Sequence, residues 1–409
     1  MTLRRAAIVS PIRTAVGKFG GSLASLDAGK LGAVVLKALI ERTGIDPAKV
    51  DDVVFSQGYG NGEAPCIAHW SWLAADLPID VPGYQLDRRC GSGLQAVVNA
   101  AMMVQTGMSD VVVAGGVESM SNVEHYSTDI RKGMRSGNLT LHDRLTRGRV
   151  MSQPIERFGV ITGMIETAEN LARDYGISRE QADAYAVRSH QRAAAAWANG
   201  RFDDELVPVS IPQKKGEPII FAHDEGYRAD ASMETLGALK AIEAKTIPGA
   251  VVTAGNASQQ NDAAAACLVV AEDKLDALGL EPIAWFHSWS AAGCDPSRMG
   301  IGPVPAVERL FARSGLGWKD IDLVELNEAF APQVLACLKG WGWSDDDSRN
   351  DILNVNGSGI SLGHPIGATG GRILANLTRE LVRRDGRYGL ETMCIGGGQG
   401  IAAIFERAR

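Results

Sequence analysis

The chain of 409 residues has few cysteines, no long apolar run and no excess of basic charge. Its six cysteines lie far apart, with no Cys-x-x-Cys pair and no histidine at zinc-site spacing, so we expect no metal site. No run of about 18 apolar residues occurs, and the amino end lacks the apolar centre of a signal peptide. We therefore expect a cytoplasmic protein that does not bind membranes.

The formal net charge of −7 argues against a surface that binds nucleic acid over the whole molecule. Hydrophobic residues make up 45% of the chain and charged residues 22%, which is typical of a globular protein. Single cores stop growing at about 250 to 300 residues, so the length predicts two or three domains. The 47 glycines exceed the usual share and indicate many tight turns or close backbone contacts.

Short β-branched runs alternate with longer segments of helical period, which is the pattern of an α/β fold. The clearest strands are predicted at 111–113 and 352–355, and the clearest helices at 94–104 and 373–382.

The two ends of the chain share three landmarks in the same order, at an offset of about 270 to 280 residues, which indicates a duplicated α/β unit. A Gly-apolar pair precedes a short strand in each copy, and a reactive residue then opens a turn, a helix and a strand that ends in Gly-Gly. The matched positions are Gly44 and Gly315, Cys90 and His364, and Gly115-Gly116 and Gly396-Gly397.

The segment from about 123 to 255 interrupts this pattern and carries a basic cluster. The cluster is either solvated surface or a contact for a phosphate-rich ligand or a partner subunit. Its members are Arg131, Lys132, Arg135, Arg144, Arg147 and Arg149, with Asp143 as the one acid among them.

Cys90 lies in LDRRCGSGLQAV, at the predicted start of a helix. The unpaired N–H groups there, with Arg88 and Arg89, would lower the pKa of the thiol and favour a thiolate nucleophile. The alternative is an inert buried cysteine, but such a residue does not need glycines on both sides of the next residue.

Three further stretches carry candidate chemistry. His364, in NGSGISLGHPIGATGG, is either a capping residue or a base that accepts the thiol proton. Cys394, in ETMCIGGGQG, is either a buried strand cysteine or a second acid/base. Asn327 and Glu328, in VELNEAFAP, are polar residues in an apolar setting that we expect to bind water, substrate or each other.

These stretches together resemble the thiolases, which make or cleave 3-ketoacyl-CoA. The resemblance also rests on AAIVSPIRTAVGKFGG, GGVESMSN, TAEN, VTAGNAS and MGIGPVPA, in order along nearly the whole chain. It implies two β-α-β-α-β-β halves in a five-layer α-β-α-β-α core, with a loop domain inserted in the first half. The implied boundaries are 1–122 with 256–280, 123–255 for the loop domain covering the CoA site, and 281–409.

The resemblance also implies a role for each site residue. Cys90 would be the acylated nucleophile, His364 its activator and Cys394 the acid/base. Asn327 would hold a water that forms one oxyanion hole with His364, and the N–H groups of Cys90 and Gly396 would form the other. CoA contacts would come from Arg228, Thr235, Ser258, Ala329, Phe330 and Met164, with Met299 near the acyl group.

The resemblance implies CoA and acyl-CoA as substrates, no tightly bound cofactor, and a homodimer or homotetramer. Three places depart from the usual pattern: Gly163-Met164 where many members have His-Met, Asp87 where Asn is usual, and Gln259-Gln260 where a small, apolar pair is usual. The first and third bear on the shape of the pocket, and hence on acyl length.

We predict an acetyl-CoA C-acetyltransferase that acts on acetyl-CoA and acetoacetyl-CoA. The alternative within the family is a β-oxidation thiolase for longer 3-ketoacyl-CoAs. A non-catalytic, thiolase-like lipid carrier would have lost one of the four catalytic positions, all of which are present, and a ketoacyl synthase-like enzyme would have a second histidine in place of Cys394.

Overall fold

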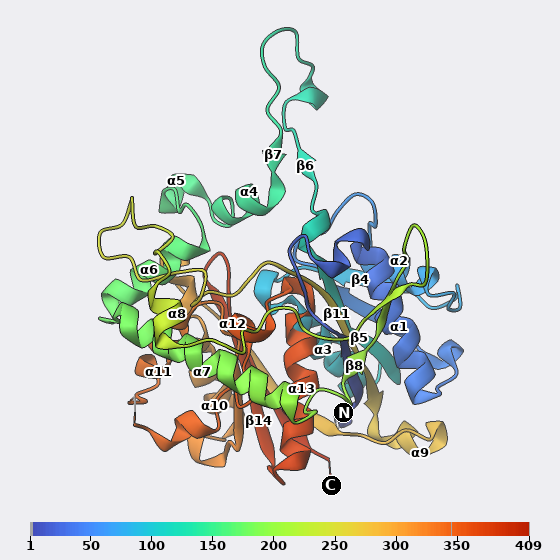
Figure 1. Cartoon of the computed structure of the whole chain (residues 1–409). Helices are drawn as coiled ribbons and strands as arrows, with labels where there is room; N and C mark the ends of the chain where they lie inside the picture. Colours follow the sequence, from blue (N-terminus) through green and yellow to red (C-terminus); the bar gives the residue numbers. More distant parts are fainter. Residues whose placement is uncertain (1–2, 345, 409) are drawn as a thin grey trace.

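The structure is a computed structural model that describes residues 3–344 and 346–408 (Figure 1). Its main sheet has eleven strands, and the two ends of the sheet repeat one arrangement. In the first half the order is β4-β3-β5-β11-β1, where β3 runs parallel to both neighbours and β11 is antiparallel to β5 and β1. These strands are β1 (Ala6–Thr14), β3 (Asp52–Ser56), β4 (Gly83–Leu86), β5 (Val111–Ser119) and β11 (Asn261–Ala271), with the short β2 (Gly17–Lys18) beside β11.

The second half has the order β13-β14-β15-β12, with the same parallel and antiparallel relations. Its strands are β12 (Ala284–Gly293), β13 (Leu323–Leu326), β14 (Tyr388–Ile395) and β15 (Gln399–Arg407). The halves join where β1 meets β12, through the pairs Ala7–Trp285 and Ile8–Ala284. The matching order confirms the predicted duplication.

Helices form three layers that separate and cover the two half-sheets (Figure 1). α3 (Ser92–Gln105) and α13 (Thr369–Arg383) pack on each other, and each contacts strands of both halves, so they form the central layer. α1 (Ala28–Thr43) and α2 (Ile67–Ala74) cover the first half, and α10 (Pro303–Ser314) and α11 (Ala331–Gly340) cover the second half; α9 (Leu275–Leu278) and α12 (Gly359–Leu362) are short connections. The predicted five-layer α-β-α-β-α fold is confirmed.

Strand alternation explains why three apolar cores form. Along β5, Val111 and Val113 face the outer core with α1 and α2, whereas Val112 and Ala114 face the central core with α3 and α13. In β15 the same period of two directs Ile404 to the second outer core and its neighbours to the central core. Strands buried on both faces are apolar without interruption, as the sequence pattern of β5 requires.

The strand predicted at 352–355 is wrong, because this segment makes only isolated bridges, such as Val324 to Leu353. Asn354 has a φ of 47°, in the left-handed region, which a continuous strand cannot include. Its side chain instead accepts from Leu326 N at 2.9 Å and donates to Leu326 O at 2.8 Å. Backbone hydrogen bonds thus join this segment to β13 at Val324, and the Asn354 side-chain amide takes their place at Leu326.

The segment 123–255 packs over both halves and sends one arm away from them. The arm is the ribbon of β6 (His125–Tyr126) and β7 (His142–Asp143) with the loop between them, drawn at the top of Figure 1. β8 pairs with β1, and α7 contributes side chains to both outer cores. The remaining elements are α4 (Arg144–Val150), α5 (Ile155–Phe158), α6 (Met164–Asp174), α7 (Arg179–Ala198), β8 (Leu206–Val207), β9 (Val209–Ile211), β10 (Ile219–Phe221) and α8 (Met233–Gly237). Within residues 3–344 and 346–408, no helix is long and apolar enough to span a membrane.

Two glutamates face each other inside the central layer. Glu325 and Glu391 are a register pair of β13 and β14, and both side chains are buried on the face toward α13. Asn376 donates to Glu325 Oε1 at 2.9 Å, but neither oxygen of Glu391 has a hydrogen-bond partner among the described residues. Burial raises the pKa of Glu325 to about 8. Burial also raises the pKa of Glu391 well above its ordinary value, and the nearby Glu325 carboxyl raises it further. This pair therefore favours the protonated state.

We expect Glu391→Gln to stabilise the protein at pH 8. Because the folded pKa of Glu391 lies well above the ordinary glutamate value of 4.5, the unfolded chain releases a proton above pH 4.5 that the folded chain keeps, so the free energy of unfolding falls as pH rises through this range. Removing one ionisable group should raise that free energy by about 1 to 3 kcal/mol at pH 8, with less effect at pH 5. Denaturant midpoints at the two pH values measure this. The exposed Glu308→Gln is the control, and equal pH slopes in wild type and Glu391→Gln would contradict the expectation.

Candidate active site

A cavity of about 390 Å³ lies where α3 and α13 begin, and it brings together residues from both halves. Cys90 and Gly396 border it beside His364. One wall is apolar and belongs to a cluster with Met299, Ala329 and Phe330. The other lining residues used below are Tyr59, Arg89, Met120, Thr146, Arg149, Ser152, Gly163, Met164, Ser258, Gln259 and Gln260.

Cys90 lies in a 3-10 turn (Arg89–Gly91) that leads directly into α3, as predicted. Its side chain is 9% exposed, and burial raises the pKa of the thiol. The N–H of Gly396, which hydrogen-bonds to the thiol, and the Arg89 guanidinium both lower the pKa, but burial outweighs them. The prediction that the helix start lowers the thiol pKa overall is therefore wrong, because it did not account for desolvation.

His364 is a buried imidazole whose hydrogen bonds define its tautomer. Thr369 Oγ1 donates to Pro365 O at 3.0 Å, so it accepts from His364 Nδ1, which lies 2.7 Å away. The Nε2 atom is left as the acceptor. Burial, with a smaller effect from Arg372, lowers the pKa of His364 to about 3, so the ring is neutral at physiological pH. A neutral ring whose Nε2 carries no proton can accept one from a thiol.

Asn327 and Cys394 complete the group of predicted catalytic residues. Asn327 Nδ2 lies 3.4 and 3.5 Å from the two ring nitrogens of His364, and its buried Oδ1 has no hydrogen-bond partner in the part of the chain described. Cys394 is fully buried at the end of β14, and burial followed by the nearby Cys90 raises its thiol pKa well above the ordinary value. Both thiols are therefore protonated near neutral pH.

Glu328 points away from this group, although it neighbours Asn327 in the sequence. Its carboxylate accepts from Tyr185 Oη at 2.9 Å and Ser189 Oγ at 2.6 Å, both on α7, and from Ile360 N at 3.2 Å. Glu328 thus ties α7 to the loop that precedes His364.

Buried side chains fix the backbone around the cavity. Asn261 Oδ1 accepts from the N–H of His364 at 2.8 Å. Glu118 accepts from Gly58 N and Gly367 N, each at 2.9 Å, and so links the first half to the His364 loop. Burial raises the pKa of Glu118 to about 7. Glu118 is not among the predicted site residues, although it stands out as a carboxylate in the apolar run of GGVESMSN.

The predicted CoA contacts separate into two groups. Met164, Ser258, Ala329, Phe330 and Met299 all line the cavity beside Cys90.

Two other predicted CoA contacts, Arg228 and Thr235, do not line the cavity. Arg228 is exposed. Thr235 is exposed too, and its hydroxyl caps α8 by accepting from Ser232 N at 2.9 Å.

The three sequence departures have distinct surroundings. Gly163 lines the cavity directly before α6, and nothing lies within 4 Å of the position a Cβ would take there. Asp87 is exposed, and its Oδ1 accepts from Arg89 N at 2.6 Å. Gln259 donates to Gly226 O at 3.1 Å, and Gln260 lies beside Arg149. The third departure therefore changes the polarity of the cavity wall.

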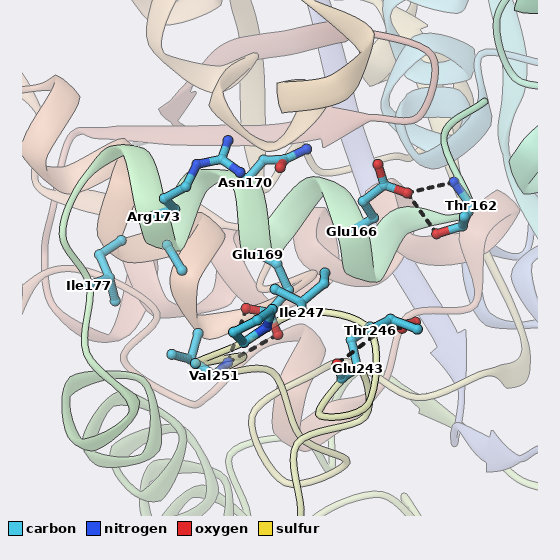
Figure 2. Close-up of a pocket in the computed structure, with 13 residues that line it drawn as sticks. Thr162, Glu166, Glu169, Asn170, Arg173, Ile177, Glu243, Thr246, Ile247 and Val251 are labelled. Carbon is cyan, nitrogen blue, oxygen red and sulfur yellow. Dashed lines mark hydrogen bonds between the residues drawn. The ribbon is translucent and has the colours of Figure 1, made fainter. Parts of the chain in front are cut away.

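A second cavity, of about 540 Å³, adjoins the first and shares Thr162, Glu166 and Glu243 with it (Figure 2). Glu166 accepts from Thr162 N and Oγ1, each at 2.7 Å. Glu169 accepts from the N–H groups of residues 251 and 252, which holds the facing loop against α6. These carboxylates are occupied by local hydrogen bonds, and none of the predicted catalytic residues lines this larger cavity, so we place the chemistry in the first.

No group of three or more His, Cys, Asp or Glu side chains in residues 3–344 and 346–408 is placed to hold a metal ion. The titratable and polar groups that line the cavity are a thiol, an imidazole, a phenol, carboxylates, amides, hydroxyls and guanidinium groups.

Comparisons with known proteins agree on one family. Residues 6–273 match the model of the thiolase N-terminal domain, and residues 280–407 match that of the thiolase C-terminal domain. An acetyl-CoA acetyltransferase of Chromobacterium violaceum is 45% identical over 402 residues, covering 98% of this chain and 99% of the relative. A β-ketoadipyl-CoA thiolase of Acinetobacter baylyi is 40% identical over 407 residues, with 99% and 100% covered. The crystal structure of the Bacillus anthracis acetyl-CoA acetyltransferase superposes with a TM-score of 0.93 at 38% identity, and all of both chains is covered.

We expect Arg89→Met to slow alkylation of Cys90. Burial raises the pKa of this thiol and Arg89 lowers it, so loss of Arg89 should raise the thiol pKa further. The rate with iodoacetamide at pH 8 should fall about two- to fivefold, since the thiolate is the reacting form. Mass spectrometry of the Cys90 peptide over time measures the rate. Arg88→Met is the matched control, because the Arg88 side chain bonds Gln399 at 3.3 Å and is not a cause of the thiol's shift. Equal slowing in both variants would contradict the expectation.

Proposed function

Because the chain belongs to the thiolase family, we propose that it catalyses reversible acyl transfer between CoA thioesters, condensing two acetyl-CoA molecules to acetoacetyl-CoA and CoA or running the reverse thiolysis. The observation that carries this proposal is the cavity in which Cys90, Gly396 and His364 meet, with Cys394 and Asn327 directly beside it. CoA and acyl-CoA are the substrates.

In thiolysis, the Cys90 proton passes to His364 Nε2 and the thiolate attacks the 3-keto carbon of the substrate. The N–H groups of Cys90 and Gly396 stabilise the developing oxyanion. The bond between C2 and C3 then breaks, Cys394 donates its proton to C2, and acetyl-CoA leaves. The products of this step are an acylated Cys90, an imidazolium and a Cys394 thiolate.

In the second step, CoA gives its thiol proton to the Cys394 thiolate and attacks the acyl group on Cys90. The Cys90 thiolate leaves and recovers its proton from His364. Asn327, through a water on its free Oδ1 and together with His364, stabilises the enolate oxygen of acetyl-CoA. Condensation is the same sequence in reverse. Protonated resting thiols suit this scheme, because Cys394 acts first as an acid.

The segment 123–255 supplies the cover of the site in this proposal. Its residues Thr146, Arg149, Gly163 and Met164 line the cavity together with the catalytic turns of the two halves. We retain the division into residues 1–122 with 256–280, 123–255 and 281–409 as a proposal, with Arg228 and Thr235 as exposed contacts for the nucleotide part of CoA.

We propose a cytoplasmic location and a homotetrameric assembly. All six cysteines are free thiols, which suits a reducing compartment. The arm from β6 to β7 exposes large apolar side chains far from the core, a feature that favours contact with another copy. These side chains are Ile130, Met134, Leu139 and Leu141.

Cys90→Ala should abolish both the acyl-enzyme and turnover, because no other group can form the thioester intermediate. Incubation with acetyl-CoA followed by intact-mass spectrometry should show one acetyl group on wild type and none on the variant. Acetoacetyl-CoA cleavage with added CoA should fall by at least about 10³-fold. Cys66→Ala, at an exposed cysteine outside the cavity, is the control. An active Cys90→Ala enzyme would refute the mechanism.

A double variant, Ile130→Ser with Leu141→Ser, tests the arm. If the arm joins copies of the chain, the solution mass from light scattering should fall from that of a tetramer to that of a dimer. Ile219→Ser with Ile220→Ser, two exposed residues of β10, is the matched control and should leave the mass unchanged. A wild-type monomer or dimer would refute the tetramer.

A further inference from the structure

The lining of the active-site cavity includes two arginines, one of which directly precedes Cys90 in the chain. Arg89 and Arg149 both line the cavity, and they are linked through Tyr59. The Arg89 guanidinium lies 5.9 Å from the centre of the Tyr59 ring, and Arg149 hydrogen-bonds to the Tyr59 hydroxyl. With the Gln260 amide oxygen facing Arg149, it accepts from Nη1 at 3.2 Å and from Nη2 at 2.6 Å. This part of the cavity wall is therefore cationic.

Neither arginine forms an ion pair with a carboxylate of residues 3–344 and 346–408. Arg89 Nη2 donates to the carbonyl oxygen of Gly148 at 2.9 Å, and Arg149 contacts an amide and a phenol. By contrast, Arg144, on the same helix as Arg149, pairs with Glu124 at 2.6 Å. Both cavity arginines are only partly exposed, and a partly desolvated cation without a counter-ion costs free energy that an anionic ligand would offset.

The carboxylates around the two arginines already accept hydrogen bonds from other groups. Glu166 and Glu243, which also line the cavity, accept from Thr162 and Thr246. Asp87 is exposed and accepts from the backbone N–H of Arg89, and Glu118 accepts from three backbone N–H groups. The backbone of Arg89 has a φ of 48°, a left-handed conformation that a non-glycine residue seldom adopts. The hydrogen bond from Asp87 stabilises that conformation, which directs the Arg89 side chain along the cavity wall. Strain of this kind is characteristic of functional positions.

We infer that the acyl subsite accepts a 3-oxoacyl-CoA whose acyl chain ends in a carboxylate, with Arg89 and Arg149 as the groups that bind that carboxylate. The inference rests on the proposed thiolase activity and specifies its substrate class. Guanidinium groups bind carboxylates through paired, charge-assisted hydrogen bonds, and Tyr59 and Gln260 hold Arg149 in place. The phosphates of CoA are the other anion available, but the pantetheine arm separates them from the reacting sulfur, whereas Arg89 adjoins Cys90 in the chain.

The reaction balances for such a substrate as it does for acetoacetyl-CoA. The Cys90 sulfur bonds to C3, the bond between C2 and C3 breaks, and Cys394 supplies the proton that makes acetyl-CoA. The Cys90 thioester then carries an acyl chain with a free carboxylate. CoA displaces it and releases a dicarboxylic acid mono-CoA thioester. The carboxylate takes part in no bond change and stays paired with the arginines throughout.

The test compares thiolysis of 3-oxoadipyl-CoA and 3-oxohexanoyl-CoA, which have equal chain lengths and differ in the terminal carboxylate or methyl group. Wild type should have a kcat/KM about 10- to 100-fold higher for 3-oxoadipyl-CoA, the range expected for a charged pair in a partly buried site. Arg149→Met and Arg89→Met should each reduce this ratio about 10-fold or more. Arg149→Lys should retain part of it, since the charge remains.

The exposed Arg157→Met, which makes the same change outside the cavity, should leave the ratio at the wild-type value. A wild-type enzyme that cleaves 3-oxohexanoyl-CoA as well as 3-oxoadipyl-CoA would overturn the inference, whether or not the variants fold. If the arginines bind the CoA phosphates instead, the variants will lose kcat/KM equally for both substrates. The ratio of the two kcat/KM values will then not change, a result that also overturns the inference. Failure of wild type to cleave acetoacetyl-CoA and both longer substrates would instead refute the proposed function.

Discussion

The contact on which the site depends is the crossing of α3 and α13 at their amino ends. A Cβ on Gly93 would lie 2.9 Å from Gly367 O, and one on Gly370 would lie 2.0 Å from Leu94 N, so only glycine fits at both positions. This backbone-to-backbone contact brings the turns that carry Cys90 and His364 from opposite halves of the chain to one cavity. The duplication thus has a chemical result, because each copy contributes one half of a nucleophile and base pair.

Burial determines the electrostatic character of that cavity. Desolvation raises the pKa values of Cys90 and Cys394 and lowers that of His364, so all three groups are uncharged at rest. In the proposed mechanism, the one ion pair that forms, an imidazolium with a thiolate, has no net charge. A site that moves protons between buried groups without changing its total charge avoids the largest desolvation cost.

Much of the fold could be predicted from the sequence, because strand runs, helix periods and glycine turns are local signals. The repeated order of landmarks indicated the duplication, and the glycines around Cys90 indicated a reactive turn.

Burial could not be predicted in the same way, since it depends on how the two halves pack. The shift of the thiol pKa was consequently predicted in the wrong direction. The strand predicted at 352–355 failed because Asn354 forms a side-chain substitute for pairing that local propensity does not reveal. Arg149 is the member of the basic cluster that lines the cavity. The sequence could not distinguish it from the other members, because its position depends on how α4 is placed over the cavity.

The position of β1 in the sheet has a consequence for synthesis of the protein. Both of its long neighbours, β11 and β12, begin after residue 260, so the first strand to leave the ribosome is among the last to be paired. Until then the only partner made, among the described strands, is the two-residue β8, which pairs with Arg13 and Thr14, so most of this apolar strand has both edges open. Such long-range pairing slows folding and exposes strand edges to aggregation. Assistance by a holding chaperone during translation would therefore protect β1 more than any other element of the sheet.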